Sequence, residues 1–335
     1  YLVPNFVSDE SSWHYIDCAT ATIVSYPHGM GVLPNGMYCG GAYSPELDRI
    51  YFAPKRGSVD NQWHYIDCSD GTVHSYLHGA TAVNGAYFGA VYSPNQARIY
   101  FMPRNQGQQT KWHFVNCSNG DIEDYSHGAT VVSGAYFGGT YDPFNDRIYF
   151  TPFNQASQSQ WHYIDCSDGN VHPYPSGASA VNGAYLLNGY YSSSDNRIYL
   201  APNTQSAQGT WHYIDCDSGS VEEYDAPVLT SGAYAGAAYS NTLNRVYFGP
   251  LSVSDEASWH YLSFDSTSVE CAVINKDGVN HIGRVDGSNI PTGEIVDTAT
   301  AQTLTNKTIT APIISTIFNT GTLALPTGTD TLVGR

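Results

Sequence analysis

Short hydrophobic runs rich in Tyr, Ile, Val, Phe and Trp alternate with turn residues along most of the chain. Four kinds of run follow one another in a fixed order: GAYxGxxY, RIYFxP, WHYIDC and a short xVxSY run. A Pro/Asn/Asp turn such as SPNQA separates the first two runs, and SDG or SNG separates the last two. Such turns predict hairpins, and no segment shows sustained helical periodicity. The pattern therefore predicts antiparallel β structure.

These four runs recur as one unit of about 49 residues, each marked by a Trp that opens a WHY phrase. Four antiparallel strands per repeat are typical of a propeller blade, whereas the coils of a β-solenoid, the second possibility, are shorter and lack hairpin turns. We predict an all-β fold, with a β-propeller of about six four-stranded blades over residues 1–285 and an extended β-rich fibre segment over 286–335. The marker residues are Trp13, Trp63, Trp112, Trp161, Trp211 and Trp259.

Residue size predicts the order of strands within a blade. The GAYxGxxY run carries small residues such as Gly85 and Gly89, so we expect it to be innermost, where blades converge, with the xVxSY run outermost. Five inner strands are recognisable, and the first blade lacks one. Residues 278–285 loosely resemble an inner strand, and we predict that they close the ring beside Tyr1. The alternative is that residues before Tyr1, which lies inside a repeat unit, supply this strand or further blades.

Charge narrows the range of partners. The chain has 30 acidic and 13 basic residues and a net charge of −17. Nucleic acids and anionic membranes require a surface rich in Lys and Arg, so neither is an expected partner. No apolar run approaches the ~18 residues that span a bilayer, so membrane insertion is not expected. The 27 Tyr and six Trp residues favour β structure and binding surfaces.

The composition changes abruptly from Asp286 onward. The last 50 residues contain 13 Thr and no Tyr, Trp, Cys or His. A single copy of such a segment cannot bury a core, and the alternatives are a shaft formed by several chains or a disordered Thr-rich linker. TLTNKTIT, NTGTLALPT and TDTLVGR, in that order, resemble modules of tail-fibre and related fibre proteins of bacteriophages and large viruses. The resemblance implies a trimeric shaft and a location on the virion surface. Free thiols suit assembly in the reducing cytoplasm of a host.

Residues repeated in every blade are expected to serve the blade itself. The Cys of the WHYIDC run is too far from its counterparts for a disulfide, and we interpret it as a small buried hydrophobe. The His after each Trp is expected to hydrogen-bond within its blade. The repeated Arg is expected to pair either between blades or at a turn, and the Asp of the WHYIDC run to anchor the SDG turn. Neither CxxC nor HExxH occurs, so no metal or cofactor is predicted. The repeated cysteines are Cys18, Cys68, Cys117, Cys166 and Cys216.

The candidate binding residues lie in the two long connections of each blade, exemplified by SYLHGATAVNGA and MPRNQGQQTKW. Amide and hydroxyl groups hydrogen-bond sugars, and aromatic rings stack on them, so these connections predict glycan recognition. Three His-Gly phrases could bring imidazoles to the propeller axis to bind a metal or an anion; the alternative is a structural His in a turn. The predicted binding residues are His28, His78, His127, Asn84, Gln106, Gln108, Tyr87 and Tyr136.

We therefore predict a non-enzymatic fibre or adhesin subunit of a virion, whose propeller binds a host-surface glycan or receptor. Its other expected partners are further copies of itself, through the fibre segment, and other virion proteins. One alternative is a purely structural spacer or decoration protein. A second is a polysaccharide-degrading fibre enzyme, which is disfavoured because identical repeated Asp residues provide no unlike pair of carboxyl groups to act as acid and base.

Overall fold

The structure is a computed structural model that describes residues 1–4, 12–30, 36–56, 62–229, 231–240, 242–252 and 258–264. It also describes the backbone of 270–275 and 280–282. The predicted fibre segment, 286–335, lies outside the described residues, so its trimeric shaft stays a prediction. In the described part, no helix is long and apolar enough to cross a membrane.

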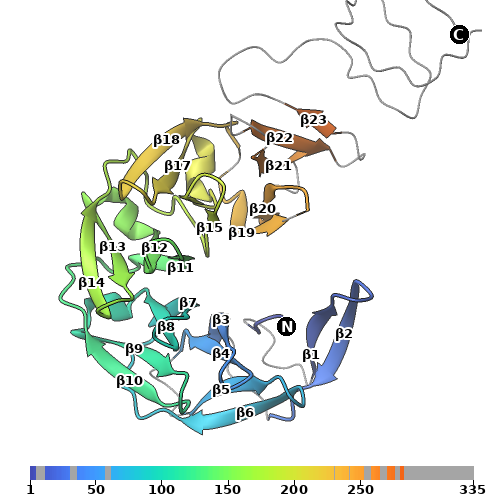
Figure 1. Cartoon of the computed structure of the whole chain (residues 1–335), viewed down its shortest axis with the longest axis vertical. Coiled ribbons are helices and arrows are strands. Elements are labelled where there is room, and N and C mark those ends of the chain that lie inside the picture. The colour runs from blue at the N-terminus through green and yellow to red at the C-terminus, as the bar shows by residue number, and fades with distance from the viewer. Residues whose placement is uncertain are drawn as a thin grey trace, which may run out of the picture. The chain divides into compact units, whose positions relative to one another are not determined.

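The chain forms a β-propeller of successive antiparallel sheets (Figure 1). A two-stranded sheet comes first, four sheets of four strands follow, and the last sheet has five strands. We number these six sheets as blades one to six. Blade one is β1 (Ser12–Asp17) and β2 (Thr22–Pro27); blade two is β3 (Tyr38–Ser44), β4 (Arg49–Pro54), β5 (Gln62–Asp67) and β6 (Thr72–Leu77); blade three is β7 (Tyr87–Ser93), β8 (Arg98–Pro103), β9 (Lys111–Asn116) and β10 (Ile122–Ser126).

The remaining blades keep this order of strands. Blade four is β11 (Tyr136–Asp142), β12 (Arg147–Pro152), β13 (Gln160–Asp165) and β14 (Asn170–Pro175); blade five is β15 (Tyr190–Ser192), β16 (Arg197–Tyr199), β17 (Thr210–Asp215) and β18 (Ser220–Asp225). Blade six is β19 (Tyr234–Ser240), β20 (Arg245–Pro250), β21 (Ser258–Ser263), β22 (Glu270–Asn275) and β23 (Asn280–Ile282). Single-turn 3₁₀ helices η1 (Gln106–Gln108), η2 (Asn154–Ser157) and η3 (Thr204–Ala207) precede β9, β13 and β17.

The predicted order of strands is confirmed. The GAYxGxxY strands β3, β7, β11, β15 and β19 contact one another in sequence, while xVxSY strands lie at the outer edge of blades two to five. Small residues are required at this centre. A Cβ on Gly40 would lie 2.8 Å from Cα of Gly89, and both glycines have positive φ. Any side chain there would push neighbouring blades apart and strain the backbone.

Blades one to five each pack their Trp-bearing face on the next blade. In the interface between blades two and three, Tyr51 and Trp63 pack with Ile99, Phe101 and Val115. The same arrangement recurs between blades three and four, four and five, and five and six. These apolar interfaces form the core of the propeller, and their burial is the main source of its stability.

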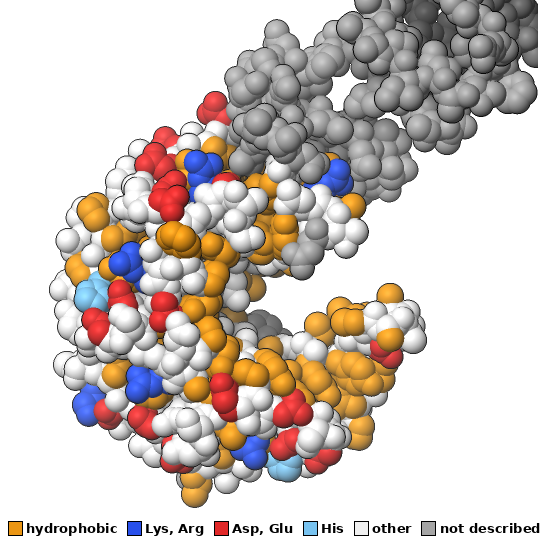
Figure 2. All heavy atoms as spheres, viewed as in Figure 1, with side chains coloured by type: hydrophobic (Ala, Val, Ile, Leu, Met, Phe, Trp, Pro, Cys, Tyr) orange, Lys and Arg blue, Asp and Glu red, His pale blue; other side chains and the backbone are white. Residues whose placement is uncertain are grey.

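The two ends of the series differ from the blades between them. Leu2 N–H donates to the carbonyl of His14 (3.0 Å), so Tyr1–Pro4 lies beside β1 as the second strand does in other blades. Ile16 and Ile23 are 50% and 70% exposed, and hydrophobic side chains cover this end (Figure 2). At the other end Trp259 is 40% exposed, whereas Trp161 is fully buried.

The ring closure predicted for residues 278–285 is not seen in the described part of that segment. Asn280–Ile282 forms β23 and pairs with β22, as the outermost strand of blade six. Among the described strands, none pairs blade one with blade six. The other residues of the segment lie outside the described ones, so their placement beside Tyr1 stays a prediction.

Candidate functional site

The connections within and between blades separate the propeller into two faces. Turns of four residues join first to second strands, as between β7 and β8, and turns of four or five residues join third to fourth strands in blades two to five, as between β5 and β6. The longer connections, such as 78–86 and 104–110, emerge at the opposite end of the strands, which we call the loop face. Long connections carry function more often than tight turns, so the loop face is the candidate binding surface.

The three His of the His-Gly phrases do not meet at the axis. Each stacks on the Trp of its own blade: the ring centroids are 4.5 Å apart for His28 and Trp13, and 3.8 Å apart for the other two pairs. Nδ1 of each His accepts a backbone N–H two residues further on. The structural alternative therefore describes them, because stacking and a backbone hydrogen bond hold each ring against the Trp of its own blade. The other pairs are His78 with Trp63 and His127 with Trp112.

Gln106 is also part of the scaffold. Its side chain is 1% exposed and joins the two long connections of blade three. Oε1 accepts Val83 N–H (2.9 Å), and Nε2 donates to the carbonyls of Thr81 (3.3 Å) and Lys111 (3.0 Å). Gln155 and Gln205 make the corresponding bonds in blades four and five, so the recurring Gln indicated this role in the sequence.

Tyr87 and Tyr136 lie in the core. The prediction that they bind a ligand is therefore wrong, and their role is structural. Their hydroxyls bond Nδ1 of His113 (2.6 Å) and His162 (2.5 Å). Both rings are fully buried, so a ligand on the surface cannot stack on them. This confirms the prediction that the repeated His hydrogen-bonds within its blade. Blades two, five and six contain the same pair: Tyr38–His64, Tyr185–His212 and Tyr234–His260.

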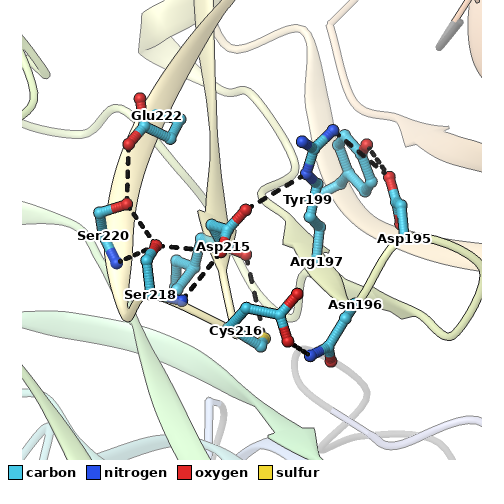
Figure 3. A network of polar contacts seen from close by, with 11 residues as sticks. Asp195, Asn196, Arg197, Tyr199, Asp215, Cys216, Ser218, Ser220 and Glu222 are labelled. Atoms are coloured by element: carbon cyan, nitrogen blue, oxygen red, sulfur yellow. Dashed lines mark hydrogen bonds and ion pairs between the residues drawn. The ribbon is translucent and has the colours of Figure 1, made fainter.

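The repeated Arg and Asp hold the tight turns, as predicted. In blade five, Arg197 pairs with Asp215 (3.6 Å) and Asp195 (3.7 Å), and Asp215 accepts the Ser218 N–H and hydroxyl (both 3.0 Å) (Figure 3). Arg49–Asp67 and Arg147–Asp165 repeat the pair in blades two and four. The carboxylates of Asp67, Asp165 and Asp215 have the same surroundings and hold the turns, so their role is structural.

The repeated Cys differs between blades. Cys117, Cys166 and Cys216 are buried, and burial raises the pKa of the Cys117 thiol to about 11. Cys68 is half-buried and Cys18 is exposed, so the prediction of a buried hydrophobe holds for three of the five. Cys18 differs because blade one has no Trp-bearing blade packed on it among the described residues.

A polar groove of about 540 Å³ opens at the loop face beside blade three. One wall is the connection 78–81, and the other is 109–111 at the start of β9. Gln106, His113 and Ile122 also line it, with Asp124 on β10. Two of the predicted binding residues, His78 and Gln106, therefore border the groove. Its surface offers hydroxyl, amide and imidazole groups, and Thr81, Gln109 and Thr110 are exposed. The groove can therefore donate and accept several hydrogen bonds to one bound molecule.

The charged groups of the groove are one ion pair. Lys111 Nζ donates to both carboxylate oxygens of Asp124, at 3.0 and 2.8 Å. Both side chains are about half exposed, so the pair contributes little to stability and stays accessible to a ligand. Burial lowers the pKa of His113 to about 4, so its ring is neutral at pH 7. Gln160 and Pro173 occupy the positions of Lys111 and Asp124 in blade four. The ion pair therefore distinguishes the groove beside blade three from the equivalent surface of blade four.

The other two predicted residues, Asn84 and Gln108, are exposed on the loop face. Neither lines the groove; the Asn84 carbonyl accepts the side-chain amide of Asn105 (3.1 Å). No group of three or more His, Cys, Asp or Glu residues that could hold a metal ion occurs in the part of the chain that the structure describes. Sequence reasoning missed Gln109, Thr110, Lys111 and Asp124, although Lys111 and Asp124 break the repeat at their positions.

Comparison with solved structures supports the propeller fold. A putative 6-phosphogluconolactonase from Bacteroides uniformis matches with a TM-score of 0.52 over 84% of this chain and 90% of its own, at 12% identity. The periplasmic gluconolactonase of Pseudomonas aeruginosa matches with 0.52 over 80% and 74%, at 10% identity. A catalytically inactive virginiamycin B lyase from Staphylococcus aureus gives 0.49 over 75% and 85%, at 15% identity.

At such low identity the likeness shows the fold alone, and of these three structures the two with a TM-score of 0.52 are both named as lactonases. No protein-family model matches the chain, and no curated protein matches it significantly. The function is therefore argued from the geometry of the loop face.

Proposed function

We propose that the chain is a fibre or adhesin subunit of a virion, and that the loop face of its propeller binds a host-surface glycan. The observation that carries the binding function is the groove beside blade three. Its exposed amide and hydroxyl groups and its Lys111–Asp124 pair match the hydrogen-bonding groups of a sugar. The virion setting is supported by the resemblance of the segment after Asp286 to viral fibre modules.

The groove favours binding over hydrolysis. Asp124 is the one carboxylate among the residues that line it, and it is held by Lys111. Hydrolysis of a glycosidic bond by the usual mechanism uses two carboxyl groups on either side of the bond. A fibre that presents several propellers would also convert weak sugar binding into useful avidity.

A glycan array probed with the full chain and matched variants tests this function. Lys111→Gln introduces the residue that blade four carries at the same position, so the blade tolerates it, and we expect binding to fall by about tenfold or more. Gln160→Lys makes the reverse change in blade four and should leave binding unchanged. Absence of binding to any arrayed glycan would favour a structural spacer, and a fall in viscosity of a polysaccharide solution would favour the enzyme.

A further inference from the structure

Two cations lie over one aromatic ring at the loop-face end of the inner strands. Lys55 Nζ is 5.2 Å from the ring centroid of Phe88, and Arg104 Cζ is 4.7 Å from the same centroid. Arg104 is also 4.8 Å from the ring of Phe137, which packs on Phe88 at 4.2 Å. Phe153 adds a third ring, 4.2 Å from Phe137. We name these five residues the cationic–aromatic cluster.

The backbone brings this cluster together from three successive blades. Lys55 and Arg104 follow the prolines that end β4 and β8, and the second residues of β7 and β11 are Phe88 and Phe137. The Lys55 carbonyl accepts Gly85 N–H (2.6 Å), and Arg104 N–H donates to the carbonyl of Ala86 (2.8 Å). Both cations are therefore held where neighbouring inner strands converge, apart from the groove beside blade three.

Arg104 differs from the arginines that begin the second strands. Those in blades two, four and five pair with Asp, as Arg197 does with Asp215. Arg104 forms no ion pair with any described residue, and this sets it apart. Its buried Nε has no hydrogen-bond partner among the described residues, a property that it shares with Arg49, Arg147 and Arg197. Burial lowers the pKa of its guanidinium, which records the cost of desolvation. Cation–π contacts offset part of that cost, by about 1 kcal/mol each.

The propeller scaffold does not require these residues. Lys55 and Arg104 occupy one position of the repeat, and blades four to six have neutral residues there: Phe153, Asn203 and Leu251. Phe88 and Phe137 occupy a second position, where blades two, five and six have Cys39, Leu186 and Ala235. The same backbone thus forms with neutral residues at the first position and without aromatic residues at the second. The chain has a net charge of −17, yet two cations lie together at a position where the repeat accepts neutral residues. This placement indicates that they bind a ligand of opposite charge.

We infer that the cationic–aromatic cluster binds the carboxylate of an acidic sugar, of the uronic acid class, on the loop face. The guanidinium of Arg104 can bind a carboxylate through two parallel N–H groups, and Lys55 adds a second positive charge. The half-buried rings of Phe137 and Phe153 supply an apolar surface for the face of the sugar ring. That the ligand is a sugar rests on the proposed glycan binding. That the ligand carries a carboxylate rests on the two cations of the cluster.

Calorimetric titration of the full chain tests the inference with tetragalacturonate, the neutral galactose tetramer and inorganic phosphate as separate probes. We expect the acidic tetramer to bind at least about tenfold more tightly than the neutral one. Arg104→Gln should abolish that difference, and Arg104→Lys should restore part of it, because the charge remains but the two parallel N–H groups are lost.

Arg98→Gln is the matched control. Arg98 also stacks on an aromatic ring, with Cζ 4.2 Å from the centroid of Phe114, but it begins β8 at the end opposite the loop face. Its substitution should leave the preference for the acidic tetramer unchanged, and melting curves of all variants verify that they are folded.

The outcomes separate this inference from the proposed function. Equal binding of the acidic and neutral tetramers, with sensitivity to Lys111→Gln, would overturn the inference and retain the glycan-binding groove. Phosphate that competes with the acidic tetramer and binds as tightly would show a general anion site and overturn the sugar assignment. If Arg104→Gln abolishes binding of the acidic tetramer and Lys111→Gln does not, the result would support the cluster as its binding site and count against the groove.

Discussion

The interfaces between blades and the loop face depend on the repeat in opposite ways. In the interfaces, Trp63, Trp112, Trp161 and Trp211 occupy one position and are all buried, and each blade from two to six contains the same Tyr–His hydrogen bond. At the loop face, the buried Gln106, Gln155 and Gln205 recur, but other equivalent positions differ from blade to blade. Lys111 corresponds to Gln160, and Arg104 to Phe153.

This difference indicates how the two regions are constrained. A residue at a blade interface must fit the preceding or following blade, so one solution recurs wherever that interface recurs. An exposed side chain at the loop face, such as Lys111, has no such neighbour to fit, and the sequence at these positions is free to differ. In this propeller, the positions that interrupt the repeat are therefore the better candidates for binding than the residues that define it.

The largest expected effect is a loss of stability in acid. Burial lowers the pKa of four interface His residues to about 4, whereas an unfolded His titrates near 6.5. Because the folded-state pKa is the lower one, their contribution is fully present above about pH 6.5 and is lost as the pH falls toward 4. The free energy of unfolding should fall by several kcal/mol, on the order of 1–2 for each residue. The four are His64, His113, His162 and His260.

Urea unfolding between about pH 7.5 and 4.5 measures this change, and His162→Gln should reduce its slope. A midpoint that stays constant over this range would show that these imidazoles are not buried as neutral groups.

Removal of an interface Trp should have the next largest effect. Trp161 is fully buried, and its Nε1 donates to the carbonyl of Gln155 (3.1 Å). Trp161→Ala should lower the free energy of unfolding by about 3–5 kcal/mol, whereas Trp259→Ala, at the exposed end, should lower it by about 1–2. Equal losses in urea unfolding would mean that the Trp259 face is covered as fully as the others.

The Tyr–His hydrogen bond should contribute less than the Trp. Tyr136→Phe removes the hydroxyl that bonds Nδ1 of His162 and leaves a buried nitrogen without a partner, at a cost of about 1–3 kcal/mol. Tyr43→Phe is the control, because its hydroxyl bonds Asp48 (2.8 Å) at an exposed site. Thermal unfolding of both variants should show a clear decrease in melting temperature for the first and almost none for the second.

The smallest expected effect on stability belongs to the loop face. Lys111→Gln and Arg104→Gln each introduce a residue without charge at a position where other blades are neutral, so the free energy of unfolding should change by less than about 0.5 kcal/mol. A loss of 2 kcal/mol or more for either variant in urea unfolding would place that residue in the scaffold and remove the contrast between the two regions.

Most of the fold could be predicted because the repeat displays it several times. The Trp spacing, the SDG turns and small residues such as Gly89 predicted the blades and the order of their strands. The pairing of Asn280–Ile282 with β22 could not be predicted, because the resemblance to an inner strand is loose and neighbouring strands compete for the same short segment.

The candidate site was predicted less well than the fold. Polar connections located the loop face, but Gln106 and Tyr87 are buried, and composition does not reveal which polar or aromatic side chains turn inward. The repetition of Gln106 at Gln155 and Gln205 was a signal of its structural role. Lys111 and Asp124 were missed because their proximity depends on the register of β9 against β10, which the hairpin prediction does not specify.

Hydrogen–deuterium exchange of the full chain, with and without the strongest ligand from the glycan array, tests the central claim most directly. The claim is that the loop face binds. Ligand should slow exchange in the connections 78–81 and 109–113 and leave the tight turns 94–97 and 167–169 unchanged. Protection of those turns, with none at the loop face, would contradict the account.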